Sequence, residues 1–141
     1  MTVKRASDRS RDARLKALAE RYLAALNRGD ADAVLALFHL NATVEDPVGG
    51  TQLRGLTEIE PFYRRAMARG LRVELEAPIR ASHGDCAAYA MRVVLADMTL
   101  RVIGVLAFDD EDLITEMRAY HGPSDVKAHG ADEQVSSKIA T

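Results

Sequence analysis

The sequence has few of the features that mark several large classes of protein. It contains one cysteine, Cys86, and no tryptophan. A framework of internal disulfides is therefore excluded, and the thiol is expected to be a small buried apolar group. The charge is nearly balanced, with 19 Lys and Arg against 21 Asp and Glu, which argues against a surface that binds nucleic acid. No apolar run is long enough to cross a bilayer, and Met1–Arg14 is polar and basic, unlike a secretory signal. We therefore expect a cytoplasmic protein with no nucleic-acid and no membrane partner.

The length of 141 residues suits a single folded domain. We expect this domain to cover 12–126, after a mobile arm at 1–11. The polar segment 127–141 contains Gly130 and lacks an apolar pattern, so it is expected to be disordered.

Hydrophobic periodicity predicts helices in the first half of the domain and mainly strands in the second. An apolar stripe at helical spacing, which includes Leu15, Leu18 and Tyr22, predicts the first helix. The predicted helices cover 12–26, 31–38 and 56–69. The predicted strands cover 42–46, 71–75, 86–95, 98–108 and 113–121. This order predicts an α+β fold, in which three N-terminal helices pack on the concave face of a cone-shaped, curved antiparallel sheet. A cavity between such layers is a natural site for an apolar ligand.

Asp46 is the strongest local candidate for a chemical role. It ends a predicted strand and is followed by Pro47, which restricts Asp46 to extended backbone conformations. A carboxylate at the mouth of an apolar cavity is only partly solvated, so its pKa rises and it can move a proton. An aspartate before proline is also a common turn residue, and that interpretation stays open.

Two tyrosines are candidates for hydrogen-bond donors in the same cavity. Tyr22 lies on the apolar stripe of the first helix, and Tyr63 lies on the third helix. A buried phenol usually needs a hydrogen-bond partner, and Tyr63 can supply one for Tyr22. A neutral donor in a dry site stabilises a developing enolate strongly. The interpretation of Tyr22 as an ordinary core residue stays open.

Four stretches at compatible spacing resemble one known family. They are Arg21 through Asp30, Ala42 through Pro47, Pro61 through Arg64 and Pro78 through His83. Together with the strand pair that ends in Phe108-Asp109 and Ile114 to Tyr120, they are similar to the ketosteroid isomerase (steroid Δ-isomerase) family. That family belongs to the broader group with the nuclear-transport-factor-2-like fold. The resemblance covers Leu18 to Asp125.

The resemblance implies a homodimer that needs no cofactor or metal and acts on a small apolar substrate, a steroid. It implies that Asp46 is the general base, which moves a proton between two carbons through a dienolate intermediate. It further implies that Tyr22 donates a hydrogen bond to the dienolate oxygen, with Tyr63 behind it. This family is itself the source of the general rule for a base aspartate beside such an oxyanion hole.

Three positions depart from the family pattern. Gly104 stands where the family has its second oxyanion donor, a protonated acid, and loss of one donor costs about 100- to 1000-fold in turnover. Phe38 replaces a third tyrosine of the hydrogen-bond network, and His121 replaces a pocket tryptophan. We expect His121, or a water over Gly104, to substitute for the missing donor.

The same resemblance assigns the walls of the pocket and suggests two alternative functions. The residues assigned to the walls are Phe62, Tyr89, Met91, Val93, Leu100 and Val102. Ordinary packing in the core would also explain an apolar residue at each of these positions. An epoxide hydrolase or cyclase of the same fold is one alternative, but it needs a second acid, and strand alternation turns the candidate Glu74 outward. A non-catalytic binding protein for steroids or other lipophilic molecules is the other, because Gly104 would enlarge the cavity. Arg69 is expected on a solvated helix face.

Overall fold

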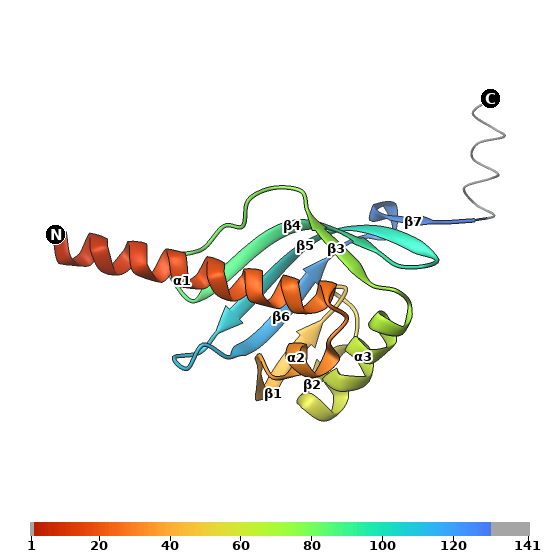
Figure 1. Ribbon diagram of the computed structural model, residues 1–141, viewed down its shortest axis with the longest axis horizontal. Coiled ribbons are helices and arrows are strands. Elements are labelled where there is room, and N and C mark those ends of the chain that lie inside the picture. The colour runs from red at the N-terminus through yellow and green to blue at the C-terminus, as the bar shows by residue number, and fades with distance from the viewer. Residues whose placement is uncertain (1, 131–141) are drawn as a thin grey trace.

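The computed structural model describes residues 2–130, with side chains from residue 9 onward. Helices come first and strands dominate afterwards (Figure 1). The helices are α1 (Thr2–Asn27), α2 (Ala31–Leu35) and α3 (Leu56–Ala68). The strands are β1 (Phe38–Glu45), β2 (Gln52–Arg54), β3 (Arg72–Leu75), β4 (Cys86–Val94), β5 (Met98–Phe108), β6 (Ile114–Tyr120) and β7 (Val126–Ala128). A 3₁₀ turn, η1 (Pro123–Asp125), precedes β7. The α+β class predicted from the sequence is confirmed.

The strands form one curved, mixed sheet. Its order is β2-β1-β6-β5-β4-β3, and β7 pairs with β5. The expectation of a wholly antiparallel sheet is wrong at one place, because β1 and β6 run parallel. These two strands are far apart in the chain, and parallel neighbours need a long crossover, which α3 and β3 to β5 supply here.

Helix α1 lies across one face of the sheet (Figure 1). Its predicted apolar stripe is buried, and Leu15, Ala19 and Tyr22 are each at most 2% exposed. The end of the helix is fastened to β3 by the Asn27 side chain. Its amide donates to the Val73 carbonyl at 2.9 Å and accepts from the Val73 N–H at 2.7 Å. Tyr22 therefore has a fixed position relative to the sheet.

Several predicted boundaries in the first half of the chain differ from the structure, and β2 was not predicted. Helix α1 begins at Thr2, so it includes residues that were expected to form an arm. The second predicted helix is shorter than 31–38, because α2 ends at Leu35 and Phe38 begins β1. Phe38 pairs with Ile114 of β6, whose N–H donates to the carbonyl of Leu37 at 2.8 Å. This tertiary pairing outweighs the helical apolar pattern of the segment.

The end of the chain also contains structure that the sequence did not predict. Lys127 and Ala128, expected in a disordered tail, belong to β7 and pair with Thr99 and Met98 of β5. Residues 131–141 of that predicted tail lie outside the described residues.

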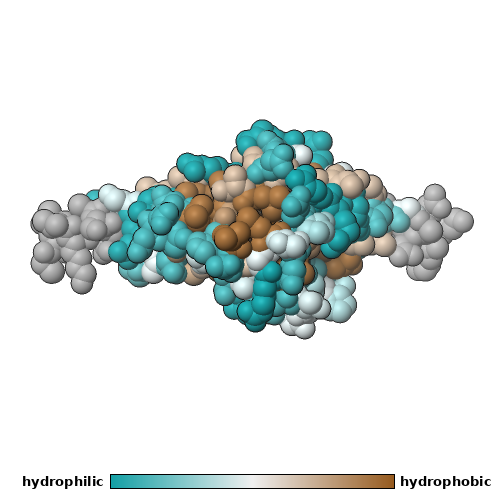
Figure 2. Space-filling view, turned by 90° about the horizontal axis from the view of Figure 1, so that it is seen from below, coloured by the Kyte–Doolittle hydropathy of each residue, from teal (hydrophilic) through white to brown (hydrophobic). Residues whose placement is uncertain are grey.

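The surface seen from below Figure 1 carries a central hydrophobic area framed by hydrophilic side chains (Figure 2). Four large apolar side chains are exposed on the described part of the chain: Leu40, Leu75, Ile103 and Tyr120. The strand alternation that turns Glu74 outward also predicts that Leu75 faces inward, but Leu75 is 46% exposed. None of the helices within residues 2–130 has the length and apolar character needed to cross a membrane.

Candidate active site

The main candidate site is an apolar cavity between α1, α3 and the sheet. The cavity has a volume of about 190 Å³ and is partly open to solvent. Its walls are Tyr22, Leu26, Asp46, Pro47, Phe62, Tyr63, Ala66, Arg69, Leu71, Val73, Met91, Val93, Leu95, Met98, Leu100, Val102, Met117, Ala119 and His121. A cavity of this size and character suits a compact apolar ligand.

The parallel pairing of β1 and β6 positions Asp46 in this cavity. Both strands end at the same edge of the sheet, which brings Asp46 and His121 together although they are 75 residues apart in the chain. The segment after Asp46 is fixed by the Val48 N–H, which donates to the Ala119 carbonyl at 2.8 Å. Glu45 points to the other face, where its carboxylate accepts from the Gly49 N–H at 2.8 Å. Opposite directions for two successive side chains are those of a regular strand.

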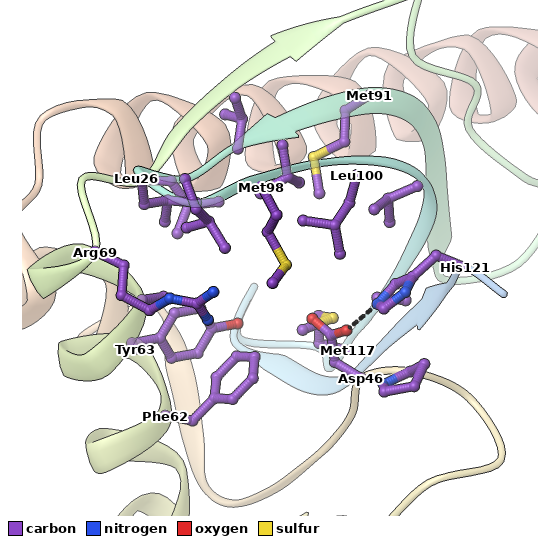
Figure 3. A pocket seen from close by; sticks show the side chains of 18 of the residues that line it. Leu26, Asp46, Phe62, Tyr63, Arg69, Met91, Met98, Leu100, Met117 and His121 are labelled. Carbon is purple, nitrogen blue, oxygen red and sulfur yellow. Dashed lines mark hydrogen bonds and ion pairs between the residues drawn. The ribbon is translucent and has the colours of Figure 1, made fainter. Parts of the chain in front are cut away.

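Asp46 and His121 form a close pair at one side of the cavity (Figure 3). The His121 Nε2 lies 2.7 Å from Asp46 Oδ1, and the two side chains are 12% and 25% exposed. Burial raises the pKa of Asp46, while the hydrogen bond and the charge of His121 lower it by a smaller amount. An ionised Asp46 needs Nε2–H of His121 as its donor, since a carboxylate only accepts. The result is a carboxylate that is held in place and is more basic than usual.

Tyr22 and Tyr63 form a second polar pair in the cavity. Their hydroxyl oxygens are 2.7 Å apart, and both residues are 2% exposed. Burial, with a smaller contribution from neighbouring acidic groups, raises the pKa of both phenols well above the ordinary value, so both stay neutral. When Tyr63 donates to Tyr22, the Tyr22 proton is free to point into the cavity. Phe38 adds no hydrogen bond and packs its ring 5.6 Å from that of Tyr63.

The space above Gly104 is filled by Tyr89. The two residues face each other across β4 and β5. A Cβ atom added to Gly104 would clash with the Tyr89 ring and would lie 2.7 Å from its hydroxyl oxygen. The expectations that a water occupies this space and that Gly104 enlarges the cavity are therefore wrong. Neither Tyr89 nor Gly104 lines the cavity.

The other predicted wall residues all reach the cavity: Phe62, Met91, Val93, Leu100, Val102 and His121. Arg69, which was expected on a solvated helix face, also lines it. Figure 3 places Arg69 across the cavity from Asp46. Its Nη2 donates to both carboxylate oxygens of Asp97, at 2.8 and 3.0 Å. The helical spacing of Phe62, Ala66 and Arg69 would have indicated this position. Met98 and Met117 were also missed, and no local pattern distinguishes them from core residues.

Glu74 lies outside the cavity, as strand alternation predicted. Its side chain is 63% exposed and lies 3.5 Å from Arg92 Nη2. Asp46 is therefore the one carboxylate among the described residues that line the cavity. Within residues 2–130 no three His, Cys, Asp or Glu side chains are grouped to hold a metal ion.

Comparison with known proteins places the chain among relatives with related folds and different activities. The model of the SnoaL-like domain matches residues 19–117. A steroid Δ-isomerase from Nocardioides simplex is 38% identical over 118 residues, which cover 81% of this chain and 94% of that protein. Epoxide hydrolase LasB from Streptomyces lasalocidi is 28% identical over 138 residues, and the match covers 80% of this chain and 49% of LasB.

A solved structure shows the same fold. The epoxide hydrolase/cyclase-like enzyme SalBIII superposes with a TM-score of 0.77 at 23% identity, over 81% of this chain and 95% of that one. At this level of identity the likeness concerns the fold and leaves the reaction open. From the domain match and the 38% identity to a steroid Δ-isomerase, the chain belongs to the SnoaL-like family of nuclear-transport-factor-2-like domains.

Proposed function

We propose that this protein is an isomerase of the ketosteroid isomerase type, which converts a Δ5-3-ketosteroid or a similar β,γ-unsaturated ketone to its conjugated isomer. One observation carries the proposal. A single desolvated carboxylate, Asp46, shares an apolar cavity with the neutral Tyr22–Tyr63 pair. Such a cavity offers a base for a carbon acid and a donor for the enolate oxygen that forms.

The first step is removal of a proton from the carbon between the ketone and the double bond. Asp46 takes this proton, and the electron pair of the broken C–H bond delocalises over the double bond and the carbonyl to give a dienolate. Tyr22 donates a hydrogen bond to the dienolate oxygen, and Tyr63 donates to Tyr22 at 2.7 Å. Because both phenols are buried and neutral, this chain of donors places positive dipoles where negative charge develops.

The second step returns the proton to the far end of the former double bond. Protonated Asp46 gives it to the γ-carbon, which completes the conjugated ketone and restores the carboxylate. The raised pKa of Asp46 makes its carboxylate a stronger base for the first step. His121, at 2.7 Å, keeps the carboxylate directed into the cavity.

The epoxide-opening alternative has less support. The relatives LasB and SalBIII carry names of that activity, but the mechanism considered for this chain requires a second acid. Glu74 was the candidate, and it lies on the exposed side of β3. The binding-protein alternative relied on extra room above Gly104, which Tyr89 fills.

We also propose that the protein is a homodimer. The face of β4 and β5 opposite α1 carries partly exposed apolar residues that oppose each other in pairs, Ala88 with Val105 and Ala90 with Ile103. Ile103 is 48% exposed. A contiguous apolar surface on a sheet is typical of an interface between protein chains.

The direct test is isomerisation of 5-androstene-3,17-dione, followed by the absorbance of the conjugated enone, with wild type and Asp46→Asn compared. Wild type is expected to turn over, and loss of the base is expected to reduce kcat about 100- to 10,000-fold. The variant should still bind the steroid, because Asn preserves the shape of the side chain. Wild-type protein that binds steroid without turnover would contradict the proposal and favour a binding protein or an epoxide-opening enzyme.

A further inference from the structure

The hydroxyl of Tyr89 is buried and has no hydrogen-bond partner among the described residues. Tyr89 is 2% exposed, so water does not reach it freely either. Leaving a buried hydroxyl unpaired costs about 1–3 kcal/mol, so such groups are uncommon in native proteins. An apolar residue of the same shape, phenylalanine, would avoid this cost. The hydroxyl is therefore a candidate for binding something that enters the cavity.

Tyr89 does not line the cavity itself, but its surroundings place it directly behind the wall of the candidate active site. Its ring centroid is 6.5 Å from that of Tyr22. Two residues further along β4, Met91 lines the cavity, and Gly104 opposite Tyr89 is paired on its other side with Ala119, which also lines the cavity. Besides burial, the neighbouring acidic groups Tyr22 and Asp46 raise the pKa of Tyr89. Cavity-lining residues of β4 and β6 thus flank the position of Tyr89 in the sheet.

We propose that the Tyr89 hydroxyl is the second hydrogen-bond donor to the substrate oxygen that Tyr22 binds. The inference rests on the proposed function and names a further residue of its oxyanion site. An enolate oxygen has lone pairs for two donors, and a donor without a competing partner can turn toward it without breaking another bond. Burial is the largest of the effects that raise the pKa of Tyr89 well above its ordinary value, so the phenol remains a donor at neutral pH.

The identity of residue 104 is part of the same arrangement. Any side chain there would meet the Tyr89 ring, since even a Cβ atom would lie 2.7 Å from the hydroxyl oxygen. Gly104 adopts no left-handed backbone conformation that would itself require glycine. Its lack of a side chain is therefore explained by the close approach of Tyr89.

The test compares Tyr89→Phe with wild type by two readouts, turnover of 5-androstene-3,17-dione and the pKa of bound 2-naphthol. The naphtholate resembles an enolate, so donors at the site lower the pKa of the bound phenol. In the variant we expect kcat to fall about 100-fold with little change in KM, and the pKa of the bound naphthol to rise by about one to two units. We expect thermal stability to stay equal or increase, because an unpaired hydroxyl is removed. Tyr120→Phe, the same change at an exposed tyrosine, should leave both readouts unchanged.

A second variant keeps the test independent of one substitution. Gly104→Ala displaces the Tyr89 ring, so it should lower kcat in the wild-type background and have little further effect together with Tyr89→Phe. Wild-type kcat and wild-type naphthol pKa in Tyr89→Phe would overturn the inference and leave Tyr89 a packing residue. If wild type does not isomerise the ketosteroid but still lowers the naphthol pKa through Tyr89, the proposed function fails and the donor role stands. If wild type does neither, both proposals fail.

Discussion

His121 Nε2 lies 2.7 Å from Asp46 Oδ1, at the place where the parallel strands β1 and β6 end together. Burial and His121 act on this carboxylate in opposite directions. Burial raises the pKa of Asp46, and the hydrogen bond and charge of His121 lower it. The imidazole therefore tunes the base as well as holding it, and this balance can be tested by changing one residue at a time.

Replacement of His121 by alanine should raise the pKa of Asp46 further, because both of its pKa-lowering effects are removed. Asp46 must be ionised to take a proton, so kcat/KM of the wild type should rise with pH through the pKa of free Asp46. In His121→Ala this rise should move to higher pH. Steady-state rates across a pH series measure the shift.

His121→Gln is the matched control, since its amide N–H can still donate to Asp46 while the chargeable ring is lost. It should shift the profile less than His121→Ala. An unchanged acidic limb in His121→Ala would show that the Asp46–His121 contact does not govern the titration that limits activity.

Asp46→Asn should stabilise the protein near neutral pH. The pKa of Asp46 is higher in the folded protein than its ordinary value of 3.8. Below 3.8 the carboxyl is protonated in both folded and unfolded states, and no cost arises. As the pH rises through the folded-state pKa, ionising the buried group costs stability, which the asparagine avoids. The gain in melting temperature over wild type should thus shrink as the pH is lowered below the folded-state pKa of Asp46 toward 3.8. A variant that is less stable than wild type at pH 8 would contradict the assigned direction of the pKa.

Tyr22→Phe should reduce kcat about 100- to 1000-fold, because it removes the donor to the substrate oxygen. Tyr63→Phe should reduce kcat less, because Tyr63 acts by donating to Tyr22 across 2.7 Å. The double variant should lose little more than Tyr22→Phe alone, since the second hydroxyl acts through the first. Rates for the four proteins form a double-mutant cycle, and strictly additive losses would mean that the two hydroxyls act separately.

Ile103→Lys should separate the proposed dimer. It places a charge in the apolar pairs of β4 and β5 on the face opposite α1, where an unpaired charge in an interface is costly. Leu40→Lys is the control, with the same added charge on β1 at a residue that is 68% exposed. Sedimentation velocity should show a dimer for wild type and the control and a monomer for Ile103→Lys. A monomeric wild type would refute the dimer without affecting the cavity chemistry.

Strong local patterns predicted much of the fold. The apolar stripe of α1 determines one face of that helix, so its buried side was found correctly. Phe38 was misplaced because its apolar neighbours fit a helix, whereas pairing with Ile114 holds it in β1. The parallel contact of β1 with β6 depends on residues far apart in the chain, and no local pattern contains it.

Residues of the candidate site were predicted best where their place in a single helix or strand determines which way they face. Asp46 at a strand end and Tyr22 on a buried helix face are such cases. Tyr89 and Gly104 illustrate the opposite case, because their contact depends on the register of two strands. The sequence shows a missing side chain at 104, and only the register shows which side chain fills its place.

The central claim, that Asp46 carries one proton from the α-carbon to the γ-carbon, is tested most directly with substrate deuterated at the α-carbon. The reaction is run in ordinary water, and the product is analysed by mass spectrometry and NMR. A shielded carboxylate should transfer part of the label to the γ-carbon before it exchanges with solvent, and Asp46→Asn should form no labelled product at a comparable rate. Conjugated product that carries only solvent protons at the γ-carbon, or label transfer that persists in Asp46→Asn, would contradict the account.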